Sequence, residues 1–198
     1  MTAAPLTALR LQELEDAAVA MPQSRLDKER LRRTAVDHFD DVWRFLRSLG
    51  VPPDLVDDAA QEVFLVAARK FSTVTPGAEK GYLFAASVYV ARRVRRKFAR
   101  EELAPDPDDG SLELASFETP EDSLGQKEQR HLLIRLLDGL PEEMRTVFVL
   151  YEIEGQSLSE IATLLGVPMN TVASRLRRAR ARFDVRLQRV QARLRGEP

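Results

Sequence analysis

The fold is decided by residues 156–183, QSLSEIATLLGVPMNTVASRLRRARARF. Ser157 and Glu160 have the Ser-x-x-Glu spacing of a capping box, which predicts the start of a short helix. Gly166 suits the left-handed residue that ends such a helix, and Pro168 suits the start of the next one. The spacing therefore predicts a helix-turn-helix whose second helix covers residues 168–183.

The second of these helices has two chemically different faces. The apolar face, which we expect to pack on the first helix, consists of Val172, Leu176, Ala179 and Phe183. The opposite face offers the hydroxyl and guanidinium donors of Thr171, Ser174, Arg175, Arg178 and Arg182. Arginine can bind guanine through two hydrogen bonds, and the N-terminal part of a recognition helix reaches base edges. We therefore expect base or nearby phosphate contacts from Thr171, Ser174, Arg175 and Arg178. A helical hairpin that binds no DNA is the less favoured interpretation.

Helical spacing extends to both sides of this motif. Upstream, leucines at helical spacing predict a helix that ends at Gly139. Pro141 predicts the start of another helix, in which Glu142 and Glu143 face the positive end of the helix dipole. Nearer the N-terminus, the apolar spacing predicts helices over about 27–49, 54–71 and 79–100, with a polar loop over 72–81. No stretch alternates as a strand would, so the predicted fold is all-α.

The net charge of −1 hides strong segregation along the chain. Residues 92–100 carry six basic residues and no acid, and residues 171–198 carry nine basic and two acidic residues. Between them, residues 101–126 carry nine acids and no base. Basic clusters of this kind are typical of nucleic-acid contact. We also expect the acidic segment to shield the basic surfaces.

The same segregation predicts two small helical domains joined by a flexible acidic linker. An N-terminal extension covers residues 1–30, the first domain 31–100, the linker 101–126, and the helix-turn-helix domain 127–195.

Several function classes are disfavoured by composition. The chain has no cysteine, which excludes disulfides, cysteine-bound zinc and a thiol nucleophile. Its two histidines, His38 and His131, are far apart, so we expect no metal site and no cofactor. A nucleic-acid-processing enzyme would need a phosphate-binding glycine loop or a nucleophile–base pair, and neither is evident. No apolar run reaches the ~18–20 residues of a membrane helix and no secretion signal is evident, which predicts a cytoplasmic protein without membrane insertion.

The phrases EIATLLGVP and TVASRLRRAR resemble region 4 of the extracytoplasmic-function (ECF) sigma factors of bacterial RNA polymerase. The first unit resembles region 2 of the same family through the run DDAAQEVF at 57–64 and through YLF at 82–84. The resemblance covers residues 31–100 and 122–190. The two regions occur in the family's order, and finding both is more specific evidence than finding either region alone.

This resemblance implies a sigma factor that gives core polymerase its promoter specificity without catalysis. Its core-polymerase contacts, on the β′ coiled coil, would be Asp58, Gln61, Glu62 and Phe64. Its −10 promoter contacts would come from Lys80, Tyr82, Arg92, Arg93 and Arg96. The helix over 168–183 would bind the −35 element, and the family's other partners are the β flap and, commonly, an anti-sigma factor.

The sequence also departs from the family pattern. The family's usual Ala-Arg-Asn run is Ser87-Val88-Tyr89 here, an expected aspartate is Arg93, and the first aliphatic pair of the docking motif is the smaller Ala59-Ala60. The alternative is a dimeric helix-turn-helix regulator that acts without core polymerase, although such a regulator needs no Asp-x-x-Gln-Glu surface.

Overall fold

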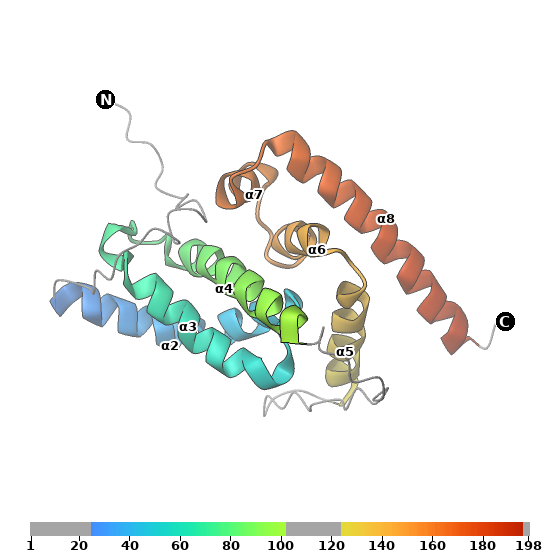
Figure 1. The fold of residues 1–198 in the computed structure, drawn as a ribbon, viewed down its shortest axis with the longest axis horizontal. Coiled ribbons are helices and arrows are strands. Elements are labelled where there is room, and N and C mark those ends of the chain that lie inside the picture. Colours follow the sequence, from blue (N-terminus) through green and yellow to red (C-terminus); the bar gives the residue numbers. More distant parts are fainter. Residues whose placement is uncertain (1–24, 102–123, 196–198) are drawn as a thin grey trace.

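A computed structural model describes residues 25–101 and 124–195 of the chain (Figure 1). Within these residues every regular element is a helix, which confirms the all-α prediction. The first unit consists of α2 (Arg25–Ser48), η1 (Pro53–Leu55), α3 (Val56–Ala68), η2 (Phe71–Thr73) and α4 (Glu79–Glu101). The second consists of α5 (Leu124–Asp138), α6 (Glu142–Phe148), η3 (Val149–Ile153), α7 (Leu158–Leu165) and α8 (Met169–Leu194). The predicted extension and linker lie mostly outside the described residues.

Helices α2, α3 and α4 bury their apolar faces against one another. Phe45 of α2 and Phe84 of α4 are both buried, and their ring centroids lie 4.5 Å apart. The helix predicted over 54–71 is shorter than expected, because α3 ends at Ala68 and Phe71 lies in the separate turn η2. There Arg30 donates to the carbonyl oxygens of Phe71 and Val74, at 3.1 and 2.6 Å, and so holds the turn.

The helix-turn-helix forms as the local sequence predicts. The backbone N–H of Glu160 donates to the Ser157 hydroxyl at 3.2 Å, and the Glu160 carboxylate accepts from the Ser157 N–H at 2.8 Å. Gly166 ends α7 with φ +66°, a left-handed conformation that glycine adopts without steric cost. On the predicted apolar face of α8, Val172, Leu176 and Ala179 are buried, and the half-buried Phe183 stacks on Phe148, with ring centroids 4.7 Å apart.

Helix α8 is longer than its sequence prediction. It continues from residue 183 to Leu194, so its second half projects beyond the helix-turn-helix (Figure 1). Helix α6 is also continued, by the π-helical turn η3.

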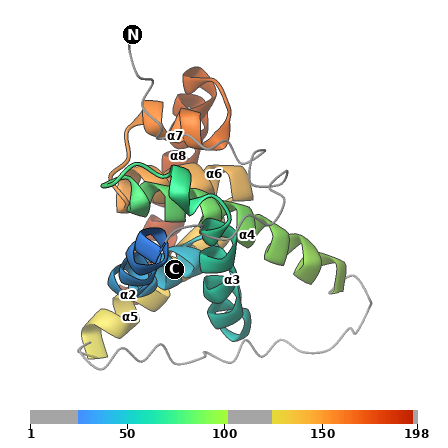
Figure 2. The same cartoon turned by 90° about the vertical axis from the view of Figure 1, so that its left-hand side faces the viewer.

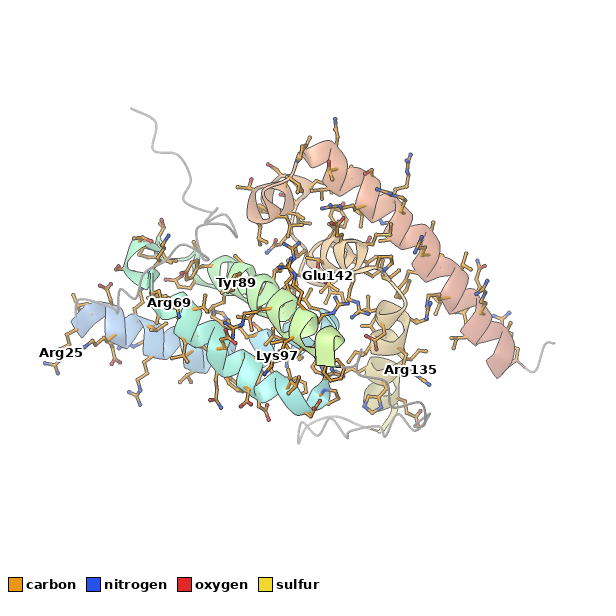
Figure 3. All side chains as sticks on the ribbon, viewed as in Figure 1. Arg25, Arg69, Tyr89, Lys97, Arg135 and Glu142 are labelled. Atoms are coloured by element: carbon orange, nitrogen blue, oxygen red, sulfur yellow. The ribbon has the colours of Figure 1, made fainter. Side chains whose placement is uncertain are left out.

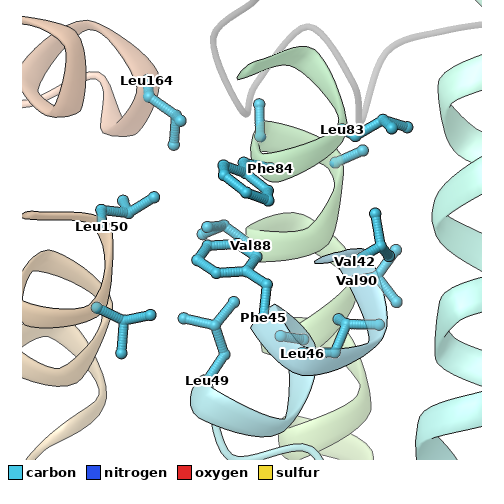
Figure 4. Close-up of a cluster of buried hydrophobic side chains, with 14 of the residues drawn as sticks. Val42, Phe45, Leu46, Leu49, Leu83, Phe84, Val88, Val90, Leu150 and Leu164 are labelled. Carbon is cyan, nitrogen blue, oxygen red and sulfur yellow. The ribbon is translucent and has the colours of Figure 1, made fainter. Parts of the chain in front are cut away.

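The two units pack against each other through a continuous buried cluster. Figure 4 shows Leu150 and Leu164 of the second unit facing Phe84 and Val88 of the first. Figure 2 shows the same neighbourhood of α4 and α6 from the side. The structure thus contains two helical units that share one core.

Candidate nucleic-acid interface

The predicted −35 contacts lie on the first half of α8. Thr171 and Ser174 are half-buried, and Arg178 is exposed. The Ser174 hydroxyl donates to the Thr171 carbonyl at 2.9 Å, and Arg178 Nε donates to the Ser174 carbonyl at 3.3 Å. These three side chains therefore share one helix face, and local hydrogen bonds hold those of Ser174 and Arg178.

Arg175 lies on this face, but it is bound by a neighbouring helix. Its Nη2 atom lies 2.5 Å from Oε2 of Glu143 in the first turn of α6. The Arg175 side chain is 15% exposed, whereas that of Glu143 is 63% exposed. The guanidinium therefore points between α8 and α6, and not straight into solvent.

The remaining arginines of this half of α8 are on the surface. Arg180 Nε donates to Glu152 at 2.5 Å, and its guanidinium lies 5.1 Å from the Tyr151 ring. The hydrogen bond to Glu152 raises the pKa of Arg180. Arg177 and Arg182 are exposed, which is the position expected of phosphate contacts or solvated side chains.

The predicted −10 residues are spread along α4. Lys80 lies in its first turn, and Arg92, Arg93 and Arg96 lie near its other end. Lys80 and Arg92 are separated by about 18 Å along the helix axis, at 1.5 Å per residue. The structure therefore does not gather these cations into one cluster, but distributes them along the helix and around it, facing α2, α3 and α6.

Each end of α4 has its own acidic partner. Lys80 Nζ lies 3.1 Å from Asp41, and Arg93 forms an ion pair with Glu62. Burial favours a raised pKa of Asp41, but hydrogen bonds from Lys80 and Arg44 outweigh it and lower that pKa. Arg96 is exposed.

Tyr82 belongs to the core of the first unit. It is 7% exposed, and its hydroxyl donates to the carbonyl of Ala67 at 3.1 Å. Burial raises the pKa of Tyr82 to about 12. In this arrangement the face of its ring packs among apolar side chains and offers no platform for a base.

Arg92 is half-buried where α4 meets α6. Its Nε atom lies 3.4 Å from Oε1 of Glu142, and Arg95 Nη1 lies 3.6 Å from the other oxygen of the same carboxylate. Burial lowers the pKa of Arg92, and the charges of Glu142 and Glu143 oppose that shift. Figure 3 shows Glu142 on the side of α6 that faces α4.

The predicted core-polymerase residues lie on α3. Asp58 and Gln61 are exposed on its outer face, and Glu62 is half-buried beside Arg93. Phe64 is half-buried and stacks on Phe39, with ring centroids 6.1 Å apart. The structure thus brings two acids and an amide together on one accessible surface.

Sequence reasoning missed the second role of the glutamates that open α6. Their fit to the helix dipole explained Glu142 and Glu143, yet Glu142 also pairs with two arginines of α4 and Glu143 with one arginine of α8. Arg95 was not predicted as part of any site. The sequence signal for these contacts was the pair of adjacent acids between two basic stretches of the chain. This signal does not indicate which arginines the acids contact.

The described part of the chain shows no group of three or more His, Asp or Glu residues that could hold a metal ion. None of its helices is both long and apolar enough to cross a membrane.

Comparison with known proteins identifies the family. The family "Sigma-70, region 4" matches residues 130–183, which include α6, α7 and the first half of α8. The chain is similar to the ECF RNA polymerase sigma-E factor of Escherichia coli strain K12, with 30% identity over 147 residues, 70% of this chain and 76% of that protein. It is also similar to the ECF RNA polymerase sigma factor SigE of Mycolicibacterium smegmatis, with 32% identity over 143 residues, 72% of this chain and 56% of that protein.

Two solved structures share the fold. The first is CnrH in complex with the cytosolic domain of CnrY, with a TM-score of 0.58, 22% identity and coverage of 81% of this chain and 89% of that chain. The second is the sigma factor RpoE in complex with the anti-sigma factor NepR from Bartonella quintana, with a TM-score of 0.61, 21% identity and coverage of 79% and 96%. On the strength of the sequence relatives and the helix-turn-helix, this chain belongs to the ECF family of RNA polymerase sigma factors.

Proposed function

We propose that the chain gives core RNA polymerase its promoter specificity and performs no catalysis itself. The observation that carries this proposal is the capped helix-turn-helix, whose α8 presents hydroxyls and arginines on one face, within a member of the ECF family. The proposed site of action is the cytoplasm.

In this proposal α8 binds the −35 element in the major groove of duplex DNA. Thr171, Ser174, Arg175 and Arg178 contact base edges or nearby phosphates, because they occupy the first half of the helix. The exposed Arg177 and Arg182 add phosphate contacts, which strengthen binding but do not select a sequence.

The first unit acts on the −10 element. Lys80, Arg92, Arg93 and Arg96 lie along α4 and supply the positive charge that the backbone of a separated strand requires. Tyr82 contributes indirectly, since its buried ring and its hydrogen bond to Ala67 fix the start of this helix.

Helix α3 docks on the coiled coil of the polymerase β′ subunit. Asp58, Gln61 and Glu62 are at i, i+3 and i+4, so their polar groups share a face that can bind arginines of a partner helix. Phe64, stacked on Phe39 beside them, offers an apolar edge. The second unit is proposed to contact the β flap.

An anti-sigma factor is a further proposed partner. The solved structure of RpoE, which has the same fold, is a complex with the anti-sigma factor NepR, and that of CnrH is a complex with the cytosolic domain of CnrY.

The proposal is tested by transcription with purified core polymerase. We expect the chain to co-purify with core and to direct initiation from specific start sites on genomic DNA fragments. A chain that binds specific DNA duplexes but neither binds core nor directs initiation would be a helix-turn-helix regulator, and the sigma-factor proposal would be wrong.

A further inference from the structure

The second half of α8 carries a basic surface outside the helix-turn-helix. Residues 184–194 of this helix lie beyond residues 130–183, which the region 4 family matches. From residue 184 to residue 195 the chain has four arginines and one acid, Asp184. Figure 1 shows that this part of α8 extends past the other helices of the second unit. The surface therefore belongs to a part of the chain that the family match does not cover.

The basic surface continues the face that the proposed function assigns to the −35 element. Successive residues of an α-helix are rotated by about 100°, so residues seven, eleven and eighteen positions apart lie within about 20° of one line along the helix. From Thr171 these steps lead to Arg178, Arg182 and Arg189. All three arginines are exposed, and we call them the arginine row. The row and Thr171 together extend over about 27 Å of the helix, at 1.5 Å per residue.

The second half of α8 is held in a fixed direction. Helix α5 packs beside α8, and Leu187 and Val190, which lie away from Arg189 around the helix, are half-buried. The Arg186 guanidinium lies so close to Gly139, in the turn before α6, that a Cβ atom at this glycine would collide with it. Helix α8 contains no proline or glycine, which are common causes of a kink. The arginine row is therefore rigidly joined to the helix-turn-helix.

The arginines of the second half have no acidic partner in the fold. In the first half of α8, by contrast, Arg175 is bound by Glu143. Asp184 is five residues from Arg189, which places it about 140° away around the helix. Within residues 25–101 and 124–195, no carboxylate forms an ion pair with Arg182, Arg189 or Arg195. Their charges are therefore available to a partner outside the chain.

The length of α8 determines what the arginine row can reach. Its 26 residues span about 39 Å, whereas the major groove of B-DNA is about 12 Å wide. The groove winds around the duplex and α8 does not bend with it, so the two halves of the helix cannot both follow the floor of the groove. When the first half lies in the groove, the second half passes beside the sugar–phosphate backbone. The C-terminal end of the homeodomain recognition helix contacts the backbone in the same way.

The chemistry of the surface favours DNA over a protein partner. Guanidinium groups bind phosphates through strong hydrogen bonds that carry opposite charges. The centre of a protein interface is instead apolar and poor in charged residues. In the described part of the second half, Val185 is the exposed large apolar side chain, and a single valine provides no such centre.

We propose that the second half of α8 binds the phosphate backbone of the duplex beside the −35 element through Arg189 and Arg195. This proposal rests on the proposed function, because it takes the first half of α8 to lie in the major groove. Arg195 directly follows the helix, is exposed, and lies about 26 Å from Arg178 along the helix axis. Because the phosphates of one strand are about 3.4 Å apart along the duplex axis, the contacts fall within about eight base pairs of the one that Arg178 makes.

The first test measures how salt affects promoter binding by the holoenzyme reconstituted from the full chain and core polymerase. The variant is Arg189→Gln with Arg195→Gln. The control, Arg25→Gln with Arg32→Gln, removes the same charge at exposed positions of α2. Each lost phosphate contact reduces the slope of log affinity against log salt by about 0.9, so the control should lose about tenfold more affinity than the variant between about 50 and 200 mM salt. Equal slopes for the two would overturn the proposal.

The second test removes the charge from the DNA. Promoter fragments carry neutral methylphosphonates at about eight successive linkages beside the −35 element, on one side of it or on the other. We expect the neutral linkages on one side to weaken binding of the unaltered chain, and to have little effect on the variant, which has already lost the arginines. An unaltered chain that ignores the neutral linkages on both sides would contradict the proposal, and so would a variant that loses as much affinity as the unaltered chain.

The two proposals can fail separately. A chain that directs no initiation with core polymerase refutes the sigma-factor role, and the same variants are then compared with the chain alone on a duplex that it selects from random sequences. A chain that initiates normally, but whose variant and control respond alike to salt and to the neutral linkages, refutes only the backbone contact. A variant that keeps its DNA affinity but binds core polymerase more weakly would show that the surface binds a protein, and would also overturn the proposal. Circular dichroism of every variant verifies that the helices are retained.

Discussion

The Nη2 atom of Arg175 lies 2.5 Å from Oε2 of Glu143, so a central arginine of the recognition helix is bound by the preceding helix. The exposed Glu143 carboxylate is screened by water, and such a pair contributes at most about 1 kcal/mol to stability. Its main effect is therefore on the direction of the Arg175 side chain and on its availability to DNA.

Replacing Arg175 by alanine should weaken −35 recognition at one base pair. Loss of a two-hydrogen-bond contact with guanine costs about 1–3 kcal/mol of discrimination. The measurement is binding of the reconstituted holoenzyme to a set of promoters that differ at single −35 positions. Arg177→Ala, at an exposed position on another side of α8, should weaken all promoters equally. An equally uniform loss for Arg175→Ala would reduce its role to a phosphate contact.

Gly50 and Arg145 should show strong energetic coupling. Arg145 is buried, donates to the Leu137 carbonyl at 2.8 Å and pairs with Asp138 at 3.0 Å, and its burial lowers its pKa to about 10. Arg145→Met leaves the Leu137 carbonyl without this donor and should lower the free energy of unfolding by about 1–3 kcal/mol.

Gly50→Ala should destabilise the chain for two reasons. Its φ of +87° is unfavourable for alanine, and the new methyl group collides with the Arg145 guanidinium. In the double variant the collision is absent, so the combined loss in urea unfolding should be smaller than the sum of the single losses. Additive losses would show that the close approach carries no energy.

The helix-turn-helix was predictable because its signals are local. The capping box joins residues three positions apart, and the left-handed Gly166 directly follows the helix that it ends. The apolar face of α8 was likewise readable from spacing alone. Such features are set by spacing within a few residues, so the sequence alone indicates them, although tertiary packing stabilises the short helices that carry them.

The contacts between the units were not predictable, because they depend on tertiary packing. Arg92 and Glu142 are far apart in sequence, and no spacing rule connects an arginine of one helix to a carboxylate of another. Tyr82 illustrates the same limit. The family resemblance implied a −10 contact for this residue, whereas its burial places it in the core of the first unit.

Tyr82→Phe should affect stability without affecting DNA binding. The variant loses the hydrogen bond to the Ala67 carbonyl, which should cost about 0.5–1.5 kcal/mol. Promoter affinity measured with the holoenzyme should stay unchanged, because the phenylalanine ring fills the same space. A selective loss of −10 binding would instead show that the hydroxyl reaches DNA.

The same tyrosine predicts a loss of stability at alkaline pH. Its pKa is about 12 in the folded chain and about 10 in an unfolded chain. Above pH 10 the unfolded chain releases this proton while the folded chain retains it, so the contribution is complete below pH 10 and falls as the pH rises to 12. Urea unfolding from pH 9 to 12 should therefore show a shallower decline for Tyr82→Phe than for the unaltered chain. Identical slopes would contradict the raised pKa.

Glu62 should affect both the binding of core polymerase and the availability of Arg93, at the basic end of α4, to DNA. It forms an ion pair with Arg93, whereas Asp58 lies on the exposed part of the same helix face. Glu62→Lys and Asp58→Lys both place a cation where the proposal needs an acid, and both should weaken binding to core polymerase in a titration with labelled chain. Asp37→Lys, at an exposed position on α2, makes the same charge change elsewhere. Only Glu62→Lys also releases Arg93, so it should raise the affinity of the free chain for single-stranded DNA more than the other two variants, which make the same change in net charge. If all three variants bind core as tightly as the unaltered chain does, the docking surface lies elsewhere on the molecule.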